Sequence, residues 1–223
     1  MEKYNKEFIK TIWKDKVENN LNLSDLKKKY FKTVDYWLKK YKFYTPNKKI
    51  VEARHKINNF NWDGKEINNE IEAYIVGLLM SDGYVVPGNG MIGIRLTDKG
   101  GEFDILSKIN NYLLKIPKKL KKNNKNVISY KIYSEVFMQN IISLGITPNK
   151  TYSQMHIPKM KTYLIRHFIR GYFDGDGTIF KDRKWLKSNI CSISKSILLE
   201  IQKFLLKNNI ESTIDTEIRQ GKK

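Results

Sequence analysis

The chain has 223 residues, of which 40% are hydrophobic and 12% aromatic, so a folded protein with a sizeable core is expected. It carries 42 Lys and Arg against 23 Asp and Glu, and this net charge of +19 favours a polyanionic partner, nucleic acid before an anionic membrane. No uncharged run approaches the length of a membrane span, and the charged start MEKYNKEFIK is unlike a signal peptide.

Cysteine and histidine give no sign of disulfides or structural zinc. Cys191 is the single cysteine, and the three histidines at 55, 156 and 167 lack the spacing of zinc ligands. We therefore expect an intracellular, reduced protein.

The lysine-rich segment 1–43 has helical periodicity. Its apolar residues predict two short amphipathic helices, capped by Ser24 and Thr33, that resemble a helix-turn-helix with a recognition helix from Thr33 to Tyr41. The alternative is a basic helical hairpin that packs on its neighbour and does not touch DNA. In the first interpretation the DNA-facing residues are Thr33, Asp35, Tyr36, Lys39 and Lys40.

Residues 44–68 mix Pro, Asn, Gly and charged residues without a sustained period, and we interpret them as a linker. The predicted organisation is a helical segment, this linker, two half-domains and a second linker between them. The boundaries are 1–43, 44–68, 69–146, 147–162 and 163–223.

One sequence pattern occurs twice. IEAYIVGLLMSDGYV (71–85) and IRHFIRGYFDGDGTI (165–179) align without a gap, and the aspartates at 82 and 176 are 94 residues apart. Each copy predicts about three turns of apolar helix with a glycine inside and Asp-Gly at the end. A repeat in constant register constrains the fold more than either motif alone.

The glycines of the repeat favour a close helix crossing. A glycine inside a helix costs roughly 1 kcal/mol relative to alanine, a cost that Gly77 and Gly171 would accept where two backbones must approach. Gly83 and Gly177 are predicted to end the two helices in a left-handed conformation.

The aspartates of the repeat point to a metal. Asp82 and Asp176 each fall at a predicted helix C-terminus, where the helix dipole disfavours a carboxylate by about 0.3–1 kcal/mol. If the two helices pack in parallel, both carboxylates and the terminal carbonyls meet at one end, a set of oxygens that suits Mg²⁺. The alternative, that Asp-Gly is only a helix-ending turn, fits one copy better than two in register.

The paired motifs resemble those of LAGLIDADG homing endonucleases. Positions 75–83 (IVGLLMSDG) and 169–177 (IRGYFDGDG) occupy the nine motif positions. The sixth position is Asp174 in the second copy but Met80 in the first, a departure at a position that is not the family's metal ligand.

The eighth motif position holds the metal ligand in this family. The resemblance therefore implies that Asp82 and Asp176 bind metal, helped by the main-chain carbonyls of Ser81 and Gly175.

The resemblance implies an α+β fold. It consists of two pseudo-symmetric αββαββα half-domains with a saddle-shaped antiparallel sheet, preceded by a small N-terminal helical domain. VVPGNGMIGIRLTD and GTIFKDRKWLKSNICSIS predict the hairpins, and Ser134 and Ser194 are predicted helix caps. ESTIDTEI begins a third strand of the second half, and we expect that half to be incomplete before Lys223, which would impair cleavage.

The saddle implies that alternate strand residues face DNA. The candidates are Arg95, Lys131, Lys181, Arg183 and Lys187, for which ordinary solvent-facing charge is the alternative. NKTYSQMHIP (149–158) resembles the family's linker, and this implies that Lys150 stabilises charge near the cut phosphate.

The sequence as a whole predicts a monomeric, site-specific homing endonuclease that hydrolyses double-stranded DNA with Mg²⁺ or Mn²⁺ and serves the mobility of an intron or intein. Two alternatives stay open. One is a non-cleaving DNA-binding regulator of the same fold, and the other is an intron RNA maturase.

Overall fold

The computed structural model describes residues 4–19, 23–41, 60–87, 90–148 and 154–216. The chain divides into two compact units, residues 1–53 and 54–223. Each unit has its own hydrophobic core.

The described part of the N-terminal unit contains three helices, α1 (Lys6–Glu18), α2 (Leu23–Lys29) and α3 (Val34–Lys40). Its core consists of fully buried aliphatic side chains from all three helices, with aromatic side chains packed around them. The buried residues are Ile9, Ile12, Leu26, Val34 and Leu38.

The two short helices predicted between residues 23 and 41 are present as α2 and α3, but this unit differs from the prediction in two respects. Helix α1 is a third helix that the lysine-rich pattern obscured, and Asn5 caps it by accepting a hydrogen bond from the amide of Phe8 at 2.8 Å. Ser24 lies inside α2 rather than before it, so it is not the cap of that helix. Thr33 does stand directly before α3.

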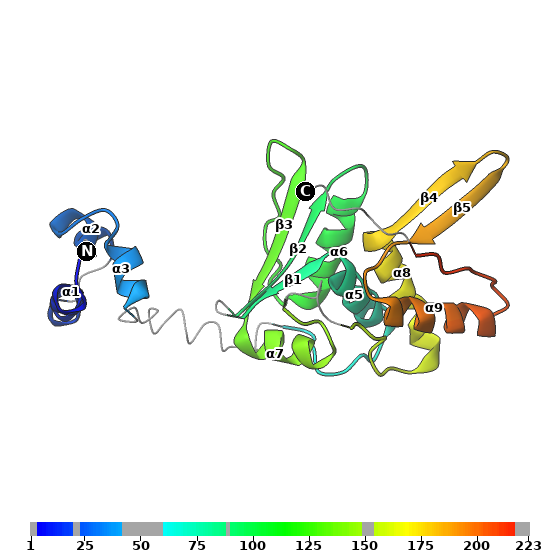
Figure 1. Ribbon diagram of the computed structural model, residues 1–223, viewed down its shortest axis with the longest axis horizontal. Helices are drawn as coiled ribbons and strands as arrows, with labels where there is room; N and C mark the ends of the chain where they lie inside the picture. The colour runs from blue at the N-terminus through cyan, green and yellow to red at the C-terminus, as the bar shows by residue number, and fades with distance from the viewer. Residues whose placement is uncertain (1–3, 20–22, 42–59, 88–89, 149–153, 217–223) are drawn as a thin grey trace. The chain divides into compact units, whose positions relative to one another are not determined.

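The first half of the larger unit contains α5 (Glu70–Ser81), β1 (Gly83–Val86), β2 (Met91–Thr97), α6 (Glu102–Leu113), β3 (Val127–Tyr133) and α7 (Glu135–Ser143). The strands form an antiparallel sheet in the order β1-β2-β3 (Figure 1). The first predicted hairpin is therefore confirmed. Between α6 and β3 the described chain makes two isolated bridges, Leu114 to Phe60 and Lys122 to Ile128, where an αββαββα half would have another strand.

The second half contains a 3-10 turn (Thr162–Leu164), α8 (Ile165–Asp176), β4 (Gly177–Asp182), β5 (Trp185–Ile190) and α9 (Lys195–Lys207). Strands β4 and β5 form a two-stranded antiparallel ribbon, as the sequence predicts. Residues 211–216 form no strand, so the third strand expected to begin there is not found among the described residues. The larger unit is thus a mixed α/β structure with antiparallel sheets.

The three-stranded sheet buries one face. Ile92, Ile94 and Leu96 of β2 alternate with more polar residues and lie in the core, where Ile128 and Ile132 of β3 join them. Ser134 caps α7 by accepting a hydrogen bond from the amide of Phe137, which confirms that cap.

The end of the predicted linker is part of the larger unit. Trp62 and Ile67 are each only 5% exposed, and Trp62 packs edge-on against the ring of Phe137. The indole of Trp62 donates to the carbonyl of Glu66 at 2.8 Å. Prolines, asparagines and charges around two isolated apolar residues hid this packing from a search for periodicity.

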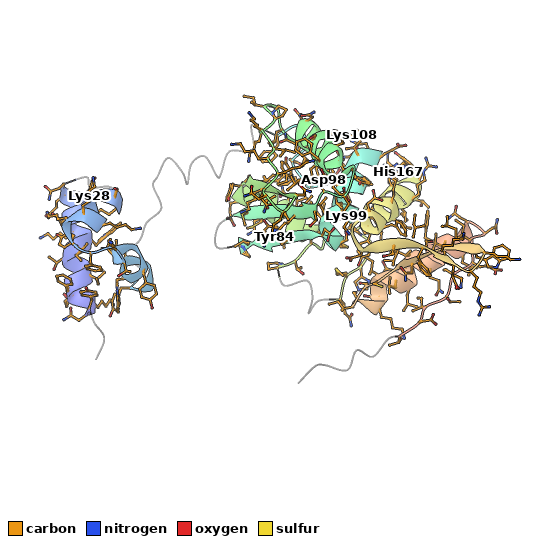
Figure 2. All side chains as sticks on the ribbon, turned by 90° about the horizontal axis from the view of Figure 1, so that it is seen from above. Lys28, Tyr84, Asp98, Lys99, Lys108 and His167 are labelled. Atoms are coloured by element: carbon orange, nitrogen blue, oxygen red, sulfur yellow. The ribbon has the colours of Figure 1, made fainter. Side chains whose placement is uncertain are left out.

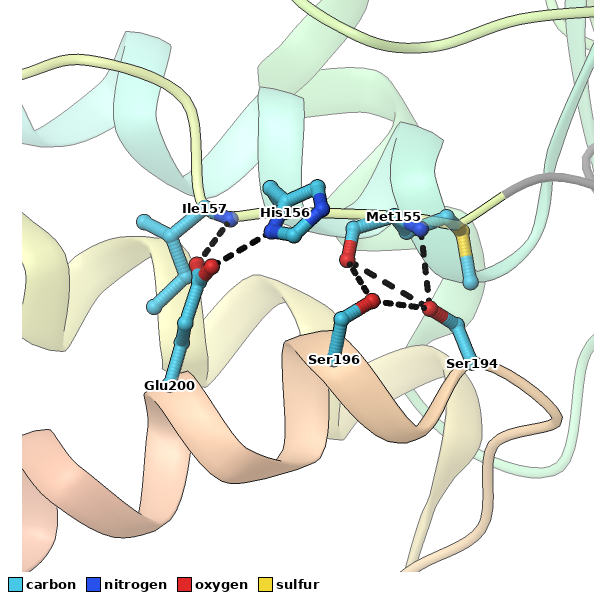
Figure 3. Close-up of polar contacts among 6 residues, drawn as sticks. All are labelled: Met155, His156, Ile157, Ser194, Ser196 and Glu200. Carbon is cyan, nitrogen blue, oxygen red and sulfur yellow. Dashed lines mark hydrogen bonds and ion pairs between the residues drawn. The ribbon is translucent and has the colours of Figure 1, made fainter.

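The segment between the two halves is fastened to α9 by side chains (Figure 3). Ser194 Oγ accepts a hydrogen bond from the amide of Met155 at 2.8 Å, and Ser196 Oγ donates to the carbonyl of Met155 at 2.8 Å. Glu200 accepts from the amide of Ile157 at 2.7 Å. Ser194 stands at the N-cap position of α9 but makes no capping bond there, so its predicted role as a cap is wrong.

Removal of the Ser194 hydroxyl should weaken the larger unit. In Ser194→Ala the buried amide of Met155 loses its acceptor, so the free energy of unfolding should fall by about 1–3 kcal/mol, measured by urea titration. Ser188→Ala is the control, because Ser188 is exposed on β5 and should change stability by less than about 0.5 kcal/mol. Equal effects of the two substitutions would show that the contact with Met155 does not stabilise the fold.

Candidate functional site

Helices α5 and α8 cross at very short range through their internal glycines. A Cβ atom built on Gly77 would lie 2.1 Å from the carbonyl oxygen of Phe168, and one on Gly171 would lie 2.0 Å from that of Tyr74. Each value is far below a van der Waals contact. The two backbones are therefore in direct contact, and neither position has room for a side chain.

The two helices run in the same direction. At one end Glu70 of α5 approaches His167 of α8 at 3.4 Å, and at the other Ser81 lies against Gly175. Residue numbers rise together along both helices, which is possible only for a parallel pair (Figure 1). The C-terminal ends of the two motif helices consequently lie together.

A polar contact also bridges the crossing. The hydroxyl of Tyr74 donates to Asp174 at 2.7 Å, and the guanidinium of Arg170 lies 4.9 Å from the centre of the Tyr74 ring. Burial raises the pKa of Tyr74, and the hydrogen bond to Asp174 raises it further, so the hydroxyl stays protonated. Asp174, at the sixth motif position, thus contacts the partner helix.

The shared end of the pair carries the two motif aspartates. Asp82 is the C-cap residue of α5, and Asp176 is the last residue of α8. A Cβ atom on Gly175 would lie 2.0 Å from Oγ of Ser81 and 3.2 Å from Oδ2 of Asp82. The end of α8 therefore lies directly against the carboxylate of α5, with the negative ends of both helix dipoles beside it.

The glycines that follow the aspartates are needed for a reason that the sequence did not reveal. Gly177 has an extended backbone (φ −89°, ψ 158°), and Gly83 has no positive φ, so the predicted left-handed caps are wrong. Both glycines begin strands directly after a helix. Their Cβ atoms would lie 2.3–2.4 Å from the carbonyl oxygens of Leu79 and Phe173, which explains the absence of side chains.

Tyr172 is a site residue that sequence reasoning treated only as an apolar position. It is fully buried, its hydroxyl donates to Oγ of Ser192 at 3.0 Å, and burial raises its pKa to about 12, with Asp176 contributing in the same direction. The tyrosine lies on the Asp176 side of the crossing. The sequence contains one sign of this role: in the alignment of the two copies, Tyr172 brings a hydroxyl to the position that Leu78 occupies in the first copy.

The oxygens at this end suit a hard divalent cation. Among the described residues no three His, Cys, Asp or Glu side chains gather as a metal cluster, so side chains alone do not supply a complete ligand set. Two carboxylates and the carbonyls at two helix ends are oxygen donors of the kind that Mg²⁺ and Mn²⁺ prefer. Ser81 Oγ is turned back to its own helix, where it lies 3.1 Å from the carbonyl oxygen of Leu78. This leaves the main-chain carbonyl as the ligand that Ser81 could offer.

Two predicted DNA-binding residues share the outer face of the three-stranded sheet. Arg95 is paired with Ser129 and Lys131 with Gly93, so the two basic residues are diagonal neighbours on the side away from the core. Both are exposed. The ring of Tyr84 (Figure 2) covers Gly93, where a Cβ atom would meet it at 2.4 Å.

A lysine-rich groove beside β3 was missed by the sequence analysis. It has a volume of about 440 Å³ and lies between residues 118–123 and the strand. Lys118 crosses the groove and donates to the carbonyl of Lys131 at 3.0 Å, and burial lowers its pKa. The signal in the sequence is the run PKKLKK, which places four lysines within six residues.

The predicted contacts on the β4–β5 ribbon do not share one face. Lys187 lies opposite Phe180, whereas Lys181 lies opposite Leu186 on the other face. Arg183 is in the turn, with φ 55°. Lys187 also forms an ion pair with Asp182 at 2.5 Å.

The remaining predicted residues belong to other parts of the chain. Thr33 and Tyr36 are exposed on the N-terminal unit, and Tyr36 packs edge-on against Trp37. Asp35, Lys39 and Lys40 are positions of α3, but their side chains lie outside the described structure, as does all of Lys150.

Residues 164–223 match the family described as LAGLIDADG-like domain. The match begins one residue before α8 and includes the second motif with Asp176. A search of curated proteins gives no match. Within the described residues, no helix is long and apolar enough to cross a membrane.

Proposed function

We propose that the chain is a LAGLIDADG-type endonuclease that hydrolyses both strands of a specific double-stranded DNA site with a divalent metal ion. One observation carries the proposal: α5 and α8 run parallel through Gly77 and Gly171, and this brings the ends that bear Asp82 and Asp176 together. The family match of residues 164–223 supports it, since LAGLIDADG domains are found in homing endonucleases and maturases.

The carboxylates of Asp82 and Asp176 would hold Mg²⁺ or Mn²⁺, with the main-chain carbonyls of Ser81 and Gly175 beside them. The bound metal would supply charge neutralisation at the scissile phosphate and an activated water. The buried hydroxyl of Tyr172 stays protonated next to Asp176 and helps to fix that end of α8. Lys150 is proposed, from the resemblance alone, to stabilise negative charge at the cut phosphate.

The basic surfaces of the larger unit would hold the duplex. Arg95 and Lys131 share the outer face of the sheet, the groove at residues 118–123 lies next to them, and Arg183 and Lys187 belong to the ribbon. Lysines and arginines on such surfaces bind phosphates and release counterions, so affinity should fall as salt rises. Helix α3 of the N-terminal unit is proposed to lengthen the recognised site.

Removal of the metal should abolish cleavage but not binding. The substrate is a plasmid that carries the uninterrupted target site, made by joining the DNA sequences on the two sides of the gene. The full chain should linearise this plasmid in Mg²⁺ or Mn²⁺ and leave it intact in EDTA, because water attack on the phosphate needs the cation. Product should appear on an agarose gel and its ends should be sequenced. In parallel, a labelled duplex of the same sequence should be retained in EDTA at matched salt.

Other outcomes of this experiment are informative. Linearisation that persists in EDTA contradicts a metal-dependent mechanism. Tight binding without any cleavage in Mg²⁺ indicates a non-cleaving regulator. In such a regulator the helical unit, with its exposed Tyr36, would contact DNA in addition to the larger unit. Higher affinity for intron RNA than for duplex DNA at equal salt indicates a maturase.

A further inference from the structure

The two copies of the motif differ in chemistry four residues before each aspartate. The second copy has Tyr172 there and the first has Leu78, and both side chains are buried. Residues four apart in a helix lie on the same face, so Tyr172 stands one turn before Asp176 and Leu78 stands one turn before Asp82. One half of the site therefore has a hydroxyl next to its aspartate, where the other half has an aliphatic side chain.

The chain that returns beside each helix end repeats this difference. The glycine after each aspartate pairs with an isoleucine of the next strand, and two residues beyond that isoleucine the first half has Leu96 and the second has Ser192. Leu78 and Leu96 both belong to the hydrophobic core. Two aliphatic side chains in the first half thus correspond to a tyrosine and a serine in the second.

Tyr172 and Ser192 form a hydrogen-bonded pair at the end of α8. Their hydroxyl oxygens are 3.0 Å apart, and Ser192 Oγ also accepts a hydrogen bond from the amide of Ser194 at 3.2 Å. The amide of Cys191 donates to the main-chain carbonyl of Asp176 at 3.2 Å, and this bond fixes the returning chain to the same turn of the helix. The pair and the last turn of α8 are therefore held together by both side-chain and main-chain bonds.

The hydroxyl of Tyr172 also lies close to the carboxylate of Asp176. Burial raises the pKa of Tyr172, and the charge of Asp176 and a hydrogen bond to it act in the same direction, so the phenol keeps its proton. Hydroxyl hydrogens rotate, and Ser192 can give its own hydrogen to the phenol oxygen. The hydrogen of Tyr172 is then available to Asp176, and a hydrogen bond of this kind fixes the orientation of a carboxylate.

We propose that Tyr172, supported by Ser192, is a positioning residue that orients the carboxylate of Asp176 for a divalent cation and makes Asp176 a stronger metal ligand than Asp82. The inference rests on the metal-dependent function proposed above and adds to it a difference between the two halves of the site.

Packing alone does not account for the polar pair. Leu78 and Leu96 fill the corresponding positions of the first half without any hydroxyl, and a buried hydroxyl costs free energy unless it is hydrogen-bonded. A carboxylate that is already held by a neighbouring hydroxyl needs less ordering when the cation binds, which strengthens it as a ligand.

The test measures cation affinity directly and needs no DNA substrate. Mn²⁺ is titrated into the full chain, and unbound Mn²⁺ is followed by electron paramagnetic resonance. Tyr172→Phe should weaken Mn²⁺ binding by about 10- to 100-fold, the usual effect of removing a residue that supports a metal ligand. Ser192→Ala should weaken it in the same direction, by on the order of tenfold. Ser192→Thr keeps a hydroxyl and should bind like wild type.

Double variants show whether the tyrosine acts through one aspartate. Tyr172→Phe should add little to the loss caused by Asp176→Asn, because the group that it orients is no longer a good ligand, whereas it should add its full effect to Asp82→Asn. Asp176→Asn alone should weaken binding more than Asp82→Asn. Tyr74→Phe is the matched control, because it removes a hydroxyl bonded to Asp174 and should bind Mn²⁺ like wild type.

The outcomes separate this inference from the function on which it rests. If wild type binds Mn²⁺ and Tyr172→Phe binds it equally well, Tyr172 does not position the ligand although the metal site stands. If wild type binds no Mn²⁺, the proposed function fails first. An equal effect of Tyr172→Phe in the Asp82→Asn and Asp176→Asn backgrounds shows a structural role and overturns the inference. If Tyr172→Phe does not fold, Ser192→Ala decides, and unchanged affinity in that variant overturns the inference too.

Discussion

Replacement of Gly77 or Gly171 by alanine is expected to lower the free energy of unfolding of the larger unit by about 3 kcal/mol or more. The new Cβ would stand 2.0–2.1 Å from a carbonyl oxygen of the partner helix, and a carbonyl in a helix has no rotamer by which to move aside. The helices would have to separate along their whole contact. Urea titration followed by circular dichroism measures the loss.

Gly100→Ala is the control for the effect of replacing a glycine by alanine where no neighbouring atom is in the way. Gly100 has open space around its Cβ position but a φ of 129°, so alanine there meets backbone strain and no clash, at a cost of about 1 kcal/mol. A loss at Gly77 no larger than that at Gly100 would contradict the close crossing. The same variants should also lose DNA cleavage, because separated helices carry the two aspartates apart.

The conversion of Asp82 or Asp176 to asparagine should reduce the rate of DNA cleavage by about a thousandfold or more, since an amide is a poor ligand for the cation that the reaction needs. Stability should stay the same or rise slightly, because each substitution removes a negative charge from the negative end of a helix dipole. DNA affinity should likewise be kept. This combination distinguishes loss of chemistry from loss of fold.

Asp174→Asn is the matched control for these two variants. It replaces the carboxylate two residues before Asp176, and the amide oxygen of the new side chain can still accept the hydrogen bond from Tyr74. Cleavage within about tenfold of wild type is expected, because this side chain contacts the partner helix rather than the shared end of the pair. Full cleavage by Asp82→Asn together with Asp176→Asn would remove these residues from the mechanism.

The sequence predicted those features that repeat or alternate. The 94-residue register between Asp82 and Asp176 located both motif helices, turn residues with period-two alternation located the first hairpin, and repetition of that order after the second motif located the second. Each of these signals is a regular pattern of residue types along the chain, which can be recognised without knowing any tertiary contact. The paired helices also follow the order of elements that the resemblance implied.

Features set by tertiary contacts were hidden. Trp62 is buried through a distant contact with Phe137, Ser194 gives its hydroxyl to Met155 instead of to its own helix, and Gly83 is required by a carbonyl rather than by its φ. In each case the deciding partner lies outside the local pattern or depends on how the backbone turns. No periodicity contains that information.

During synthesis, α5 leaves the ribosome well before α8, because the equivalent residues of the two helices are 94 positions apart, as at 82 and 176. At common translation speeds the interval lasts about 5–20 s. Throughout it Gly77 has no partner helix and Asp82 has no second carboxylate beside it. Under the proposed mechanism a nascent chain can bind nucleic acid through its first half but cannot cut it, so nuclease activity begins only when α8 has been made and has docked.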